Sequence, residues 1–444
     1  MDHKMALQFI SILLGFALLI FITFKGWSVY LASFTATMAV ILLSGLPVTD
    51  TLTKVYFAGI GGIFTSLFSL FIFGAVMARL YAVSGAAASI SEAICKAVIR
   101  DDLPQGRRRI LGVTVVILAS ALICFGGINA AIVIITIYPI ALSVFKRCGI
   151  PKRFIPGVIL GGCCTFALTG PGSPQTPNVI PMNILGTSST SGLIPGIVAS
   201  VVELAVMVLV LDRMIGRACA KGETFAMGPK DQLPDEDSRM PGTLISLIPL
   251  ALLFILFNIV QVPIVFAMLA AAACSLLLFR KYLPRGTVKA TVNEGFISAL
   301  IPVGSIGAVY GFAAVVQKTD AFASIVDTLL GMQIHPILLC ILAVAALCML
   351  TGGSATGQQI VLPIILPVIQ STGAVSIAAM HRIGSFAATT LDSLPHSGTI
   401  LMTISHADCG MKDSYPAIFV TTTLATTVGT AVTAALLYFF PGLA

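Results

Sequence analysis

The sequence predicts an all-α polytopic membrane protein with about 12 to 14 transmembrane segments, inverted repeats and discontinuous or re-entrant helices. Of its 444 residues, 57% are hydrophobic and only 10% are charged, whereas a soluble domain carries about 25% charged residues. Apolar stretches of about 20 residues recur along the chain, and that length crosses a bilayer as a helix. Two polar, proline-containing runs, 169–181 and 390–398, interrupt this pattern.

The apolar stretches define the expected membrane spans. The first resembles the hydrophobic region of a signal peptide, but no small-residue cleavage site follows it. The chain is apolar again from Trp27 onward, so we interpret the first stretch as a retained span. We expect spans at 5–24, 27–46, 56–83, 110–124, 128–145, 154–168, 193–211, 242–260, 262–280, 297–317, 335–350, 377–390 and 414–440.

The basic residues predict the topology. Two apolar segments separate each basic cluster from the next, so all the clusters can lie on one face, which the positive-inside rule makes cytoplasmic. This distribution accounts for the net charge of +7 without nucleic-acid binding. Three spans before Arg100 place the N-terminus outside, unless a crossing at 85–98 reverses it. The clusters lie at 100–109, 146–153, 212–240 and 280–289.

A weak internal repeat divides the chain. Gly127 precedes Gly172 in the first polar run by 45 residues, and Gly353 precedes Gly398 in the second run by the same 45. Seven predicted crossings separate the two glycine pairs, and an odd number gives the copies opposite orientations, as in inverted-repeat transporters. A chance match among 40 glycines is the alternative. We therefore expect five parts: N-terminal scaffold spans at 1–109, a first repeat with a broken-helix site at 110–211, a cytoplasmic linker at 212–241, further scaffold spans at 242–334, and a second repeat with a broken-helix site at 335–444.

The first run, 169–181, has the composition of an anion site. Its four prolines prevent continuous helical hydrogen bonding. Where a helix restarts after such a break, its free amides and positive dipole end suit a carboxylate. A proline-rich extramembrane loop is the alternative. The candidate substrate-binding side chains here are Thr169, Ser173, Gln175 and Asn178.

The second run, 390–398, adds ionisable groups. Asp392 and His396 lie four residues apart around Pro395, and either side chain can carry a coupling proton. Ser393 and Ser397 add neutral hydroxyl groups. A structural aspartate that caps the restarting helix is the alternative.

Other polar residues in apolar surroundings complete the candidate site. Arg382 can pair with a substrate carboxylate or with Asp392, or it can extend to the membrane–water interface. Ser354, Thr356 and Gln358 form a third helix-weakening run, and Asn129 is its counterpart in the first half. Glu203 is the other intramembrane acid, with either a scaffold role or a proton-relay role.

The cysteines give no sign of a metal or of disulfides. Most of the ten lie in apolar stretches without metal-ligand spacing, so we interpret them as buried small hydrophobic residues and expect no metal and no cofactor. Those in apolar stretches include Cys124, Cys163, Cys164, Cys274 and Cys348.

Several motifs together resemble the gluconate:proton symporter (GntP) family. In the first half they are GGINA at 126–130, YPIA at 138–141 and GSPQTPNVIP at 172–181. In the second they are HRI at 381–383, LDSLPHSG at 391–398 and KDSY at 412–415. The resemblance covers nearly the whole chain. One departure is Ser397, where the family often has an asparagine, and it leaves a short monocarboxylate as plausible as a polyol acid.

The resemblance implies a multi-pass bacterial inner-membrane permease, not an enzyme, that carries small hydroxy acids such as gluconate or 3-hydroxybutyrate with protons. It also implies a homodimer of the ion-transporter superfamily, with a scaffold and a moving transport domain that bears helical hairpins. The expected partners are a small organic anion, membrane lipid and a second copy of the chain. Sodium coupling is the nearest alternative. Two other classes of protein are less well supported. The chain has no GxSxG or HExxH motif, which would indicate an intramembrane enzyme, and no ring of like charges, which would indicate a channel.

Overall fold

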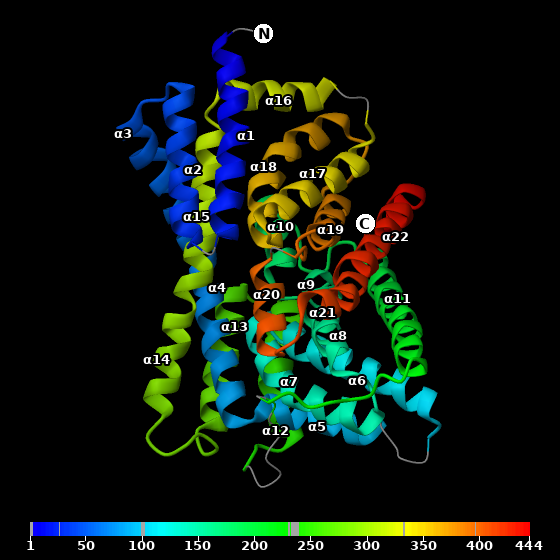
Figure 1. Ribbon diagram of the computed structural model, residues 1–444. Helices are drawn as coiled ribbons and strands as arrows, with labels where there is room; N and C mark the ends of the chain where they lie inside the picture. The colour runs from blue at the N-terminus through cyan, green and yellow to red at the C-terminus, as the bar shows by residue number, and fades with distance from the viewer. Residues whose placement is uncertain are drawn as a thin grey trace.

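The computed structural model describes residues 3–25, 27–98, 103–229, 231, 239–331, 334–395 and 397–444. This part of the chain is helical throughout, with short π and 3-10 segments and no strand (Figure 1). The all-α prediction is therefore confirmed.

Most of the helices follow one another through short connections, and the longest connection is the linker between α11 and α12. In the first half they are α1 (His3–Phe24), α2 (Val29–Ser44), α3 (Val48–Thr51), α4 (Phe57–Ser84), α5 (Ala86–Val98), α6 (Gln105–Phe125), α7 (Ala130–Cys148), α8 (Ile155–Cys163), α9 (Phe166–Thr169), α10 (Thr176–Leu185) and α11 (Leu193–Ala220). In the second half they are α12 (Thr243–Phe254), α13 (Ile264–Phe279), α14 (Val288–Ser298), α15 (Leu300–Val316), α16 (Asp320–Gly331), α17 (Pro336–Thr351), α18 (Ser354–Thr372), α19 (Ile377–Ala388), α20 (Gly398–His406), α21 (Met411–Ile418) and α22 (Ala425–Phe439).

Seven helical segments of the described chain are long and apolar enough to cross a membrane, and four shorter apolar helices accompany them. The predicted span at 154–168 is wrong as a single helix. Thr165 leaves the helical conformation, with φ −131° and ψ −124°, so α8 ends at Cys163 after nine residues. This helix is too short to cross a bilayer and stops inside the protein.

The segment after α4 does not cross the membrane. Gly85 adopts φ +75°, a left-handed conformation that glycine accepts without strain, and ends α4. The next helix, α5, has 13 residues and packs along α6, α7 and α12 at the end opposite the N-terminus (Figure 1). The N-terminus thus lies at the other end of the molecule from α5, α12 and the α13–α14 connection.

Two groups of helices lie side by side (Figure 1). In the first, α4 packs against α13, α14 and α15, and α2 packs against both α1 and α15. In the second, α6 packs against α7 and α8, α17 packs against α18 and α19, and α11 packs against α22. The helices α6, α7, α8, α10 and α11 follow one another in the same order as α17, α18, α19, α20 and α22, and Figure 1 shows α6–α8 and α17–α19 towards opposite ends. The inverted repeat and the five-part division stay predictions.

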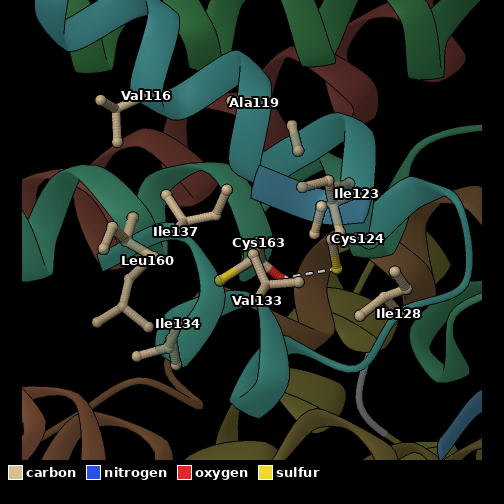
Figure 2. Packing of buried hydrophobic residues seen from close by; sticks show 14 of the residues in the cluster. Val116, Ala119, Ile123, Cys124, Ile128, Val133, Ile134, Ile137, Leu160 and Cys163 are labelled. Carbon is tan, nitrogen blue, oxygen red and sulfur yellow. Dashed lines mark hydrogen bonds between the residues drawn. The ribbon is translucent and has the colours of Figure 1, made fainter. Parts of the chain in front are cut away.

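The helices α6, α7 and α8 pack closely against one another. Ile123, Val133 and Leu160 fill the space between these helices, and the Cys124 thiol donates to the Cys163 carbonyl at 3.3 Å (Figure 2). Cys124, Cys163, Cys164 and Cys348 are buried, as predicted, while Cys274 is only half-buried.

Ion pairs hold the central linker against the basic loops. Arg153 pairs with Glu223 at 2.8 Å, and Lys152 pairs with Asp231 at 2.8 Å. Burial works to raise the pKa of Asp231, but hydrogen bonds from Lys152, the Gly228 amide and the Tyr138 hydroxyl outweigh it, and the pKa lies below its usual value. The linker therefore binds the end of the molecule that carries the basic loops.

Candidate functional site

A cavity of about 690 Å³ separates the two groups of helices. One wall comes from α4, α13, α14 and α15. The opposite wall is formed by the first residues of three helices from the second group: α7, α10 and α20. The cavity-lining residues at these helix starts are Gly127, Asn129, Ala131, Ile132, Pro174, Gln175, Thr176, Gly398 and Thr399.

The cavity is electrostatically suited to an anion. Among the described residues, no Asp, Glu, Lys, Arg or His side chain lines it. Helix starts carry free backbone amides and the positive end of the helix dipole. The wall opposite the helix starts is largely apolar, with Leu70, Phe71, Met268 and Ile301. A small molecule with an anionic group and an apolar portion fits both walls.

The start of α7 is shaped by its two glycines and an asparagine. A Cβ on Gly126 would lie 2.5 Å from the Leu250 side chain, and one on Gly127, which has φ +89°, would lie 2.8 Å from Leu253. Close contact with α12 thus requires glycine at both positions. Asn129 then caps α7 by accepting from the Ala131 amide at 2.9 Å. Its side-chain NH2 group is left to face the cavity.

Like α10, α20 begins without a side-chain cap. Its N-cap residue, Ser397, makes no capping hydrogen bond and donates instead to the Gly352 carbonyl at 3.3 Å. A Cβ on Gly398 would meet no described atom within 4 Å. The first amides of α20, at Gly398 and Thr399, therefore border open space in the cavity.

Arg382 holds in place the first polar run, 169–181, together with the segment that follows it, 182–191. This fully buried side chain extends from α19 and donates to the backbone carbonyls of Thr169, Ser189 (3.2 Å) and Ser191 (2.8 Å). It also donates to the Asn178 side-chain oxygen at 3.1 Å. Its donors are thus committed to this segment, and carbonyls that no helix satisfies gain partners inside the protein.

Three amide side chains extend this network. Asn178 donates to the carbonyls of Ser173 at 2.8 Å and Ser189 at 3.1 Å, and its oxygen also accepts from His381 at 3.0 Å. Gln358 of α18 donates to the Pro177 carbonyl at 3.0 Å. Gln175 donates to the Cys124 carbonyl at 2.6 Å, which joins the break to the end of α6.

Asn258, which sequence reasoning missed, ties the same run to the α12 segment. It donates to the Gly172 carbonyl at 3.0 Å and accepts from the Ser189 hydroxyl at 2.9 Å. The available signal was a lone amide side chain in the apolar stretch 242–260. Its partners lie 69 and 86 residues away in sequence, so the pairing itself was not visible.

The second break, in the run 390–398, contains one buried carboxylate. Asp392 is 8% exposed and accepts from the Ser393 hydroxyl at 2.8 Å, and Ser354, the first residue of α18, lies close to its carboxylate. The negative charge therefore lies near the start of α18, where it suits the positive end of the helix dipole. The other predicted proton carrier of this run, His396, lies outside the described residues.

Two of the predicted substrate-binding residues, Asn129 and Gln175, line the cavity. The others are at most 9% exposed and lie behind its wall, where small polar side chains satisfy backbone groups of the breaks. Their substrate role stays a prediction. They are Thr169, Ser173, Asn178, Ser354, Thr356, Gln358, Arg382, Ser393 and Ser397.

Comparisons with known proteins agree with this architecture. The family model described as GntP family permease matches residues 7–439. The uncharacterized transporter YxjC of Bacillus subtilis (strain 168) is 26% identical over 465 residues, covering 95% of this chain and 97% of that protein.

A solved structure has a similar fold. The YdaH transporter of Alcanivorax borkumensis, which has an unusual topology, superposes with a TM-score of 0.54 at 15% identity, covering 87% of this chain and 88% of that one. The protein is thus a multi-pass membrane transporter, and the bacterial relative is consistent with the inner membrane. Since the family model spans nearly the whole chain, including both breaks and all three helix starts at the cavity, the chain belongs to the GntP family of permeases.

Proposed function

We propose that this permease is a secondary active transporter of small hydroxy-carboxylates, such as gluconate or 3-hydroxybutyrate, driven by proton symport. The observation that carries the proposal is the meeting of three helix starts at one cavity without a charged side chain among the described residues. A carboxylate placed there accepts hydrogen bonds from the amides of α20, and the hydroxyl of Thr399 is close to its oxygens. The apolar wall of α4 and α15 receives the carbon chain.

Proton coupling is favoured over sodium coupling because backbone carbonyls of the first break already accept hydrogen bonds from side chains. Sodium sites in broken-helix transporters use unwound carbonyl oxygens. In the first break, the carbonyls of Thr169, Ser189 and Ser191 already accept from Arg382, and that of Gly172 accepts from Asn258. A bound sodium ion would have to compete with a guanidinium for three of these oxygens.

The position of the cavity supports alternating access of the elevator type. It lies between the α4/α13–α15 group and the helix starts of the other group. Movement of the second group along the first would carry a ligand bound at these helix starts across the membrane. We assign the scaffold role to the first group, and the homodimer interface to that scaffold.

Transport in proteoliposomes tests this proposal. The purified permease is reconstituted, and uptake of labelled gluconate and 3-hydroxybutyrate is measured under an imposed pH gradient, with and without sodium. We expect uptake that the pH gradient drives without sodium. Uptake that requires a sodium gradient would support the alternative carrier instead. A thermal-shift panel of hydroxy and keto acids identifies the ligand, since selective binding stabilises the folded state; if no acid shifts the unfolding temperature at any pH, the carboxylate proposal fails.

A further inference from the structure

We propose that Glu203, at the crossing of α11 and α22, is a proton-binding site of the transport cycle. This inference rests on the proposed proton symport and names the group that couples it. Glu203 lies outside the cavity lining, so the proton would bind separately from the substrate.

Glu203 is fully buried without a hydrogen-bond partner. Neither carboxyl oxygen has one among the described residues, although the Phe166 amide at the start of α9 is nearby. An ionised carboxylate in this position would lose several kcal/mol of solvation without compensation. The carboxyl is therefore held in its neutral, protonated form in this conformation. A partner-free acid is a poor structural element, since an apolar residue of the same size would stabilise the crossing more.

The crossing is built closely around this side chain. Glu203 stands in the stripe of α11 that faces the protein, between Ala199 and Met207, and is the one ionisable residue of that stripe. It faces Gly429 of α22, where a Cβ would lie 2.3 Å from a carboxyl oxygen. Glu203 and Gly429 are 226 residues apart, as are Gly172 and Gly398 of the two breaks. On the predicted repeat, the carboxyl therefore contacts its own counterpart position.

The surroundings fit a proton better than a metal ion. On the facing side of α22, the hydroxyls of Thr430 and Thr433 donate to backbone carbonyls of their own helix, and that of Thr426 donates to the carbonyls of Thr422 and Thr389. A sodium or calcium ion needs several oxygen ligands, and no group of three His, Cys, Asp or Glu residues was found within the described ranges.

No described charged side chain makes a hydrogen bond with the Glu203 carboxyl. The titratable side chains on the elements packed against α11 are Arg107, Arg108, Arg109 and Cys124 of α6, Tyr438 of α22, Cys163 of α8, and Arg382 of α19, which meets Gly192 and Gly196 at the start of α11 and donates to carbonyls of 169–191. Asp212, further along α11, pairs with Arg109. The proton on Glu203 can therefore leave only when water reaches it, that is, when α11 and α22 separate.

The Glu203→Gln variant tests the assignment. Glutamine has nearly the size of the protonated acid but cannot release a proton. We expect the variant to retain carboxylate counterflow and ligand-induced thermal stabilisation, and to lose accumulation driven by a pH gradient. Glu223→Gln is the matched control on the linker, outside the membrane, and it should keep accumulation. Accumulation by Glu203→Gln at the wild-type level overturns the inference.

Two further measurements keep the test decisive. Infrared spectra should show a protonated-carboxyl band that Glu203→Gln lacks and that Gly429→Ala shifts; a wild-type spectrum without it overturns the inference. If Glu203→Gln is not recovered folded, Glu203→Asp should shift the pH profile of uptake, and an unshifted profile is the contrary result. Absence of carboxylate counterflow in the wild-type protein would defeat the proposed function itself, whatever Glu203 does.

Discussion

The two breaks differ in the side chains whose hydrogen bonds stabilise them. In the first, donors from elsewhere in the fold, chiefly Arg382, Asn258 and Gln358, satisfy backbone carbonyls. In the second, Asp392 accepts from the Ser393 hydroxyl, and the hydroxyls of Tyr415 and Thr426 donate to the carbonyls of Ser393 and Thr389. Among the described residues, the first break thus has several amide and guanidinium ties, while the second has one acid and neutral hydroxyls. We infer that the first is a fixed frame for α10 and that the second can rearrange during transport.

Removal of Arg382 should have the largest effect on this contrast. Arg382→Met leaves the carbonyls of Thr169, Ser189 and Ser191 buried without this donor, and each buried acceptor that loses its partner costs about 1–3 kcal/mol, so the three together cost several kcal/mol. Arg382→Lys should not rescue it, because an ammonium cannot reach carbonyls in several directions from one planar group. Thermal unfolding in detergent measures the loss. Arg79→Gln, at an exposed ion pair, is the control and should change little.

The glycines at corresponding positions of the breaks should respond differently to alanine. Gly172 has φ +81°, and a Cβ there would lie 2.9 Å from the Asn258 oxygen, so Gly172→Ala should destabilise the protein by about 1–3 kcal/mol. Gly398 has open space at its Cβ and lines the cavity, so Gly398→Ala should fold normally. Its methyl group should weaken substrate binding. Unfolding temperature and substrate Kd, measured on both variants, separate the two outcomes; equal destabilisation would remove the contrast.

Sequence patterns predicted the helical fold and the places where the helices break, because both depend on local hydrophobicity and on proline and glycine. They could not predict what satisfies the broken backbone. Arg382 lies about 200 residues from the carbonyls it binds, and its alternatives, a substrate carboxylate or Asp392, were equally compatible with local sequence. The cavity was also beyond reach, since α4 and α15 supply its apolar wall through tertiary packing alone.

The carboxylate of the second break should have a moderate effect on stability. Asp392→Ala removes the acceptor of the Ser393 hydroxyl and the negative charge near the start of α18, and should cost about 1–2 kcal/mol. Ser354→Ala removes only a neutral hydroxyl close to this carboxylate and should cost less. Denaturant unfolding monitored by circular dichroism compares the two variants. A cost for Asp392→Ala as large as that for Arg382→Met would show that the second break is as firmly fixed as the first.

The linker offers the smallest effect and a control outside both breaks. The pKa of Asp231 is lowered in the folded protein, so this carboxyl adds stability above its unfolded pKa, about 3.9, and the contribution is lost as pH falls through the folded pKa. Asp231→Asn should therefore lower stability near neutral pH by about 1 kcal/mol, because an asparagine oxygen can still accept from Lys152 and Tyr138 and only the charge assistance of these hydrogen bonds is lost. The difference from wild type should vanish in acid. Because the partners of Asp231 among the described residues are Lys152, Tyr138 and the Gly228 amide, none of which lines the cavity, substrate affinity should not change. A changed Kd would mean that the linker communicates with the cavity, and the two breaks could then no longer be treated as the sole determinants of the site.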